Sequence, residues 1–110
     1  MKTTKQVLEH HLEAVISADL VEIAKDYEDS SKMLISPQGG VRSDKAAIMK
    51  FFEALLPVFK AGKFELKQQL VEGNAAMVVY DFTSPAMNVQ GGVDSFFIED
   101  GVIRYQTMKT

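Results

Sequence analysis

Residues 91–109, GGVDSFFIEDGVIRYQTMK, are the stretch that decides the fold. Strand-forming residues occupy 91–99 and 102–109, and Asp100-Gly101 between them is a two-residue hairpin signal. We therefore expect two long neighbouring strands at the carboxyl end of the chain.

The hairpin extends outward into a longer run of strands. Residues 75–83 are rich in strand formers, and Glu72-Gly73-Asn74 marks the turn that joins them to a strand over 64–72. Residues 84–90 form a looser loop with Pro85 and Asn88. The second half of the chain is thus predicted to be an antiparallel meander.

Helical signals occupy the beginning of the chain. Thr3 and Gln6 fit a capping box, and Asp19 and Glu22 form a second capping signal for a short helix whose apolar face continues to Tyr27. The first helix carries an apolar stripe that is predicted to face the interior: Val7, Leu8, His11, Leu12, Val15 and Ile16.

A short hairpin and a third helix connect the two halves. Residues 32–36 are predicted to be a short strand, 37–40 a turn and 41–42 its partner strand. Ser43 is expected to cap the third helix, and Pro57 to end or kink it. Helices followed by a meander indicate an α+β fold, with the helices covering one face of an antiparallel sheet.

The composition limits the chemistry available. The chain has 110 residues, which fits one domain over 1–110, and it contains no cysteine, so disulfides, thiol nucleophiles and cysteine-held metals are excluded. A net charge of -3 argues against nucleic-acid binding. No stretch is long and apolar enough for a membrane span or a signal peptide, so the expected location is cytoplasmic.

Several segments together resemble the SnoaL-like (polyketide-cyclase-like) branch of the nuclear-transport-factor-2-like (NTF2-like) superfamily. They are Ala18-Asp19-Leu20, Asp26-Tyr27-Glu28-Asp29, Ser36-Pro37-Gln38-Gly39, Ala47-Ile48 with Phe51-Phe52, Asp94-Ser95-Phe96 and Glu99-Asp100-Gly101-Val102-Ile103. The resemblance implies a strongly curved sheet wrapped around three helices, with a cone-shaped pocket between them. It also implies a homodimer joined through the sheet. The superfamily contains isomerases, cyclases, dehydratases and hydrolases as well as binding proteins, so the fold alone leaves the activity open.

Two residues are the candidates for catalysis. His11 lies on the apolar stripe, whereas His10 falls on the polar side and is interpreted as a solvated surface residue. Asp94 alternates with Phe96 and so shares its face of the strand. In ketosteroid-isomerase-like relatives, the matching positions carry a tyrosine and a protonated aspartate that stabilise an oxyanion. The resemblance therefore implies acid/base chemistry at His11 and Asp94, whose simplest arrangement is a direct pair; the alternative is that both are structural.

One departure from those isomerases bears on the activity. Ser36 stands where their general base, an aspartate, would be, and a serine of ordinary pKa cannot take that proton. Steroid isomerisation by that mechanism is therefore not expected. Two hypotheses stay open: a cofactor-independent lyase, isomerase, cyclase or hydrolase, and a non-catalytic ligand-binding or dimeric interaction module.

The remaining expected pocket residues suit a small, mostly hydrophobic organic ligand. Strand 75–83 is apolar on both faces; alignment with the isomerases favours Met77, Val79 and Asp81 as pocket-facing and leaves the alternate face for a dimer partner. No metal, phosphate or cofactor motif is present in the sequence. The full expected lining is Tyr27, Met33, Ser36, Phe52, Leu55, Phe59, Met77, Val79, Asp81, Phe96, Gln106 and Met108.

Overall fold

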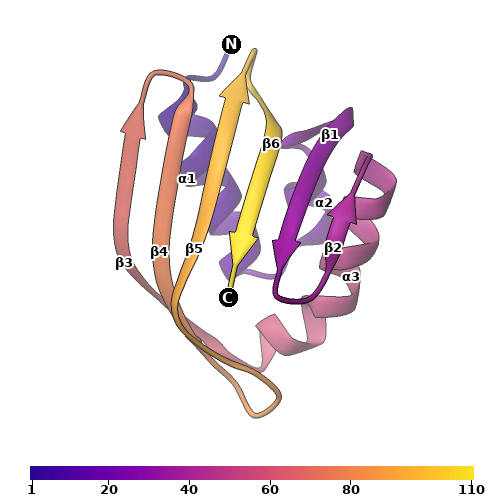
Figure 1. Ribbon diagram of the computed structural model, residues 1–110, viewed down its shortest axis with the longest axis vertical. Coiled ribbons are helices and arrows are strands. Elements are labelled where there is room, and N and C mark those ends of the chain that lie inside the picture. Colours follow the sequence, from indigo (N-terminus) through magenta and orange to yellow (C-terminus); the bar gives the residue numbers. More distant parts are fainter.

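The computed structural model describes residues 1–110, and its elements follow the predicted order. Figure 1 shows the helices on one side of the sheet, so the architecture is α+β. No helix is long and apolar enough to cross a membrane. The elements are α1 (Thr4–Ile16), α2 (Leu20–Ala24), β1 (Tyr27–Ser36), β2 (Gly40–Arg42), α3 (Lys45–Lys60), β3 (Lys63–Glu72), β4 (Ala75–Thr83), β5 (Asn88–Glu99) and β6 (Val102–Lys109).

The first two helices begin where their capping signals predict. The Thr3 hydroxyl accepts a hydrogen bond from the backbone N–H of Gln6, whose side chain accepts one from the Thr3 N–H, so α1 begins with a complete capping box. The Asp19 carboxylate accepts from the Glu22 N–H and starts α2. Val7, Leu8 and His11 of the predicted apolar stripe are buried, whereas Ile16 at its end is 48% exposed.

Several boundaries differ from the sequence prediction, including the start of β5 at Asn88 instead of Gly91. Tyr27 begins β1 instead of extending the second helix, so this strand is twice as long as the predicted one over 32–36. Asp44, and not Ser43, caps α3, and Pro57 lies inside a helix that continues to Lys60. The last turn of α3 buries Phe59, which packs edge-on against Phe64 and Phe82, and this burial favours continuing the helix past the proline.

The sheet has six strands in the order β2-β1-β6-β5-β4-β3. All neighbouring pairs are antiparallel except β1 and β6, which are parallel, so the sheet is mixed and the purely antiparallel expectation is wrong at this one pair. The parallel pairing places the end of the chain beside β1 (Figure 1). It therefore joins the first hairpin to the carboxyl-terminal meander in one continuous sheet.

The facing of β4 is the reverse of the predicted one. Val78 and Phe82 are each 1% exposed and point toward the helices, whereas Met77 is 39% exposed on the opposite face. Both faces of this strand are apolar, so the alternation alone does not choose between them, and a shift of one residue exchanges the two sets. Packing of Phe82 against Phe64, with ring centroids 4.5 Å apart, favours the observed facing.

This facing predicts different effects for two substitutions on one strand. Phe82→Ala should lower the free energy of unfolding by about 3–5 kcal/mol, since it removes a buried ring. Met77→Ala should lower it by clearly less than Phe82→Ala does, because the Met77 side chain is 39% exposed on the outer face of a single chain. Urea unfolding monitored by circular dichroism measures both, and a larger loss for Met77→Ala than for Phe82→Ala would contradict the facing.

Candidate functional site

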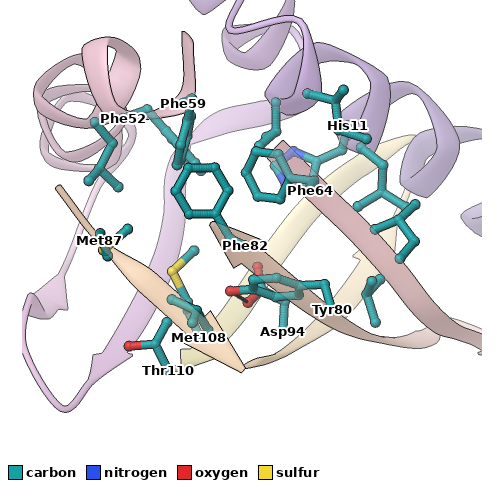
Figure 2. A pocket seen from close by; sticks show the side chains of 17 residues that line it. His11, Phe52, Phe59, Phe64, Tyr80, Phe82, Met87, Asp94, Met108 and Thr110 are labelled. Carbon is teal, nitrogen blue, oxygen red and sulfur yellow. Dashed lines mark hydrogen bonds between the residues drawn. The ribbon is translucent and has the colours of Figure 1, made fainter. Parts of the chain in front are cut away.

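A cavity of about 60 Å³ lies between the sheet and helices α1 and α3 (Figure 2). Fourteen of its seventeen lining residues are hydrophobic, and none is a lysine or an arginine. Such a lining suits an apolar ligand oriented by few polar groups. The lining comprises His11, Leu12, Val15, Ile16, Phe52, Leu55, Phe59, Phe64, Leu66, Val78, Tyr80, Phe82, Met87, Val89, Asp94, Met108 and Thr110.

Asp94 is the one acidic group in the lining. It lies on β5 between neighbours on both sides: the Tyr80 hydroxyl of β4 donates to Oδ1 at 3.1 Å, and the Gln106 amide of β6 donates to Oδ2 at 3.1 Å. Figure 2 shows the carboxylate beside Tyr80 at the cavity wall. Burial raises the pKa of Asp94 to about 7, although both hydrogen bonds act in the opposite direction. Asp94 is therefore able to gain or lose a proton near neutral pH.

A further hydrogen bond orients the Gln106 side chain toward Asp94. The Tyr27 hydroxyl, from the start of β1, donates to the Gln106 Oε1 atom, so the Gln106 amide nitrogen is left to face Asp94. Burial raises the pKa of Tyr27, and the phenol stays protonated as a donor. Tyr27, Gln106 and Asp94 thus form one ordered chain of side chains.

His11 lines the cavity from α1 and is 2% exposed. Its ring lies edge-on to the rings of Tyr27, Phe52 and Phe96, with centroids 5.4–6.0 Å away. Burial lowers the pKa of His11 to about 3, so the imidazole is neutral at physiological pH. Its Nδ1 atom is buried with no hydrogen-bond partner, which is unusual in a folded protein.

His11 and Asp94 line the same cavity, but the structure shows no hydrogen bond between them. The expected direct pair is therefore wrong, because the oxygens of Asp94 accept from Tyr80 and Gln106 instead. The site therefore has two separate polar side chains, His11 and Asp94, in an apolar lining.

The other expected pocket residues divide into four groups. Phe52, Leu55, Phe59 and Met108 line the cavity, whereas Tyr27, Met33, Phe96 and Gln106 are buried next to it or in the core without lining it. Ser36 is exposed at the end of β1, outside the lining. Met77, Val79 and Asp81 lie on the opposite face of β4, so their expected place in the pocket is wrong. The reversed strand explains three of the lining residues that were missed: Val78, Tyr80 and Phe82.

Asp81 has a structural contact instead. Its carboxylate accepts a hydrogen bond from the Gly91 N–H at 2.9 Å, at an irregularity in the pairing of β4 with β5. Gly91 has a φ of 66°, a conformation that favours glycine. The pair stabilises a β-bulge three residues before Asp94 and so helps to set the register of the strand that carries it.

His10 also departs from the expectation. It is not simply solvated: its side chain is 24% exposed and lies between two carboxylates, with Nδ1 2.7 Å from Asp26 Oδ2 and Nε2 2.9 Å from Glu22 Oε1. Hydrogen bonds to Glu22 and Asp26 raise the pKa of His10, so the ring favours its charged form. This contact ties α1 to α2 and to the start of β1. No short-range spacing signals it, since Asp26 is sixteen residues away.

No group of three or more histidine or carboxylate side chains in the structure could hold a metal ion.

Comparisons with other proteins agree with this architecture. Three solved structures are similar in fold. An NTF2-like protein of unknown function from Cytophaga hutchinsonii has a TM-score of 0.81 at 16% identity, covering 98% of this chain and 89% of that one. A candidate ketosteroid isomerase from Kribbella flavida has a TM-score of 0.80 at 14% identity, covering 96% and 76%. A candidate polyketide cyclase from Sinorhizobium meliloti has a TM-score of 0.75 at 20% identity, covering 93% and 92%.

No curated protein matches the chain. The SnoaL-like domain model, however, matches residues 8–106, which include both His11 and Asp94. On this match, the chain belongs to the SnoaL-like domain family, and it shares the fold of NTF2-like proteins.

Proposed function

We propose that the cavity binds a small, mostly hydrophobic organic molecule and that Asp94 exchanges a proton with it, without a cofactor. The observation that carries this proposal is a carboxyl group with a pKa of about 7 in an apolar cavity, held by Tyr80 and Gln106. A general acid or base works best when its pKa lies near the working pH. Perturbed carboxyl groups in cavities are common at functional sites.

Asp94 and His11 would act in different ways. Asp94 would donate a proton, or a hydrogen bond, in its neutral form and accept a proton when ionised. His11 would orient the ligand, since its neutral ring offers one donor and one acceptor and Nδ1 has no partner within the protein. This division supports an isomerase, cyclase, lyase or hydrolase type of reaction on a small organic compound. Two similar folds have names in keeping with it, a ketosteroid isomerase and a polyketide cyclase. The position of Ser36 outside the lining argues against the isomerase mechanism that needs a base there.

A second candidate function is ligand binding without chemistry. Asp94 is the one side chain in the lining whose pKa lies near neutrality, while the pKa of His11 is about 3. A reaction that needs a base and an acid at once would therefore lack one of them. In that case the cavity would hold a ligand and release it unchanged.

Incubation with a panel of small cyclic ketones and esters, followed by mass spectrometry, separates these functions. With a turned-over compound, Asp94→Asn should reduce the rate by about 10²–10⁴-fold, because it removes the proton-exchanging group. His11→Leu should also reduce the rate, and Glu53→Gln on the exposed side of α3 should leave it unchanged. Thermal stabilisation without product would favour the binding function, and an undiminished rate in Asp94→Asn would contradict the catalytic role.

The hydrogen bond from Tyr80 predicts a shift that can be measured without a substrate. Tyr80→Phe removes a donor that favours the ionised carboxylate, so the pKa of Asp94 should rise further above 7. The rise should be about one pH unit if the lost bond contributes about 1.5 kcal/mol. Titration of the Asp94 carboxyl ¹³C resonance measures it, and an unchanged or lower midpoint would show that Tyr80 does not hold the carboxylate.

We also propose that two copies of the chain associate through the open face of the sheet. Each of the six strands places one large apolar side chain on the outer surface: Val41, Leu34, Tyr105, Phe97, Met77 and Leu70. Some of these side chains are direct partners across neighbouring strands: Leu34 is opposite Val41, and Phe97 is opposite Tyr105. Contiguous exposed apolar surface of this kind is typical of an interface, and a two-fold dimer is the commonest way to cover it.

Light scattering tests this association. The wild-type protein should have the mass of two 12.2 kDa chains, and Tyr105→Glu should have the mass of one, because it places a charge in the middle of the face. Val21→Glu is the matched control, since Val21 is 70% exposed on α2 and away from the sheet face. A monomeric wild-type protein would overturn the proposal.

The remaining expectations concern location and further partners. A cytoplasmic location, independence of any cofactor, and the lack of nucleic-acid or membrane partners stay predictions from composition and motif content.

A further inference from the structure

We infer that the ligand of the cavity is a small apolar amine, bound as its ammonium ion by Asp94 among the surrounding aromatic rings. The inference rests on the proposed function in one respect, that the cavity binds an organic ligand. It goes further in assigning the ligand a positive charge and a hydrogen-bond donor.

The hydrogen-bonding groups at the cavity favour a ligand that donates. The Tyr80 hydroxyl hydrogen and one Gln106 amide hydrogen are already directed at Asp94. Each carboxylate oxygen of ionised Asp94 accepts one bond within the protein, which leaves further lone pairs on both. The neutral ring of His11 offers one further acceptor and one donor. An ammonium group supplies two or three donors for these acceptors.

The charges of the lining favour the same kind of ligand. The lining contains one acidic side chain, no lysine or arginine, and a histidine that is neutral, so an anion would meet a like charge with nothing to offset it. Five aromatic rings line the cavity, from Phe52, Phe59, Phe64, Tyr80 and Phe82. Aromatic faces attract cations, and this attraction is stronger where water is excluded. An ammonium ion would therefore be stabilised by both its counter-charge and the rings.

The surface beside the cavity also carries negative charge, as Asp94 does inside it. A shallow groove between α1 and β3 shares Leu12, Ile16 and Leu66 with the cavity lining and is bordered by Glu9 and Glu13. Neither glutamate forms an ion pair, and no lysine or arginine lines this groove. Ile16 and Leu66 are both exposed and belong to the cavity lining, as does the exposed Thr110 outside this groove. Negative charge there raises the local concentration of cations and repels anions.

Three probes of similar size and different charge test the inference: benzylamine, benzyl alcohol and benzoate. Protein-observed NMR titration at pH 8 gives each Kd and shows whether resonances of cavity residues shift. Benzylamine should bind at least about tenfold more tightly than benzyl alcohol, which corresponds to about 1.4 kcal/mol, and benzoate should bind most weakly. Asp94→Asn should weaken benzylamine at least about tenfold and leave benzyl alcohol within about threefold. Glu53→Gln, which removes the same charge from the exposed side of α3, should change neither.

Each other result decides against the inference. Benzyl alcohol binding as tightly as benzylamine would overturn the amine and leave the proposed function standing. Unchanged benzylamine affinity in Asp94→Asn would show that this carboxylate is not the counter-charge. If none of the three probes shifts the cavity resonances, both the inference and ligand binding at this cavity are contradicted. The wild-type ranking is sufficient by itself if Asp94→Asn fails to fold.

Discussion

Burial of one carboxyl group beside an apolar cavity is the constraint on which this structure depends. Asp94 keeps few contacts with water, and an isolated charge there would be very costly. The three adjacent strands β4, β5 and β6 solve the problem together: the middle strand supplies the acid and its two neighbours supply Tyr80 and Gln106 as donors. The facing of β4 and the register of β5 both follow from the need to keep these three groups in contact.

The apolar surroundings and the hydrogen bonds act on Asp94 in opposite directions. Removal of water favours the neutral acid, while the two donors favour the carboxylate, and the balance leaves the group close to half ionised near neutrality. His11 has no donor or acceptor to compensate for its burial, so it stays neutral. Asp94 and His11 line the same cavity but differ in ionisation near neutral pH. Asp94 has hydrogen-bond partners within the protein, whereas the Nδ1 atom of His11 has none.

Much of the fold could be predicted from the sequence because its signals are local. Capping boxes, the Asp100-Gly101 turn and the period of the apolar stripe each act within a few residues, and they located the helices, the last strands and the inward side of His11. The facing of β4 was not predictable from the strand itself, since both of its faces are apolar. The contact of His10 with Asp26, and the donors that occupy Asp94, join elements far apart in the chain, so only the tertiary structure brings them together.

The end of β6 has a practical consequence for work on this protein. Met108 and Thr110 form part of the cavity wall, and the Thr110 N–H is held by the Ser36 carbonyl at 3.0 Å. Any peptide fused after Thr110 therefore starts at the wall of the cavity. Met1 lies beside the turn at Gly101, far from this wall, so affinity tags and fluorescent labels are better attached at the amino terminus.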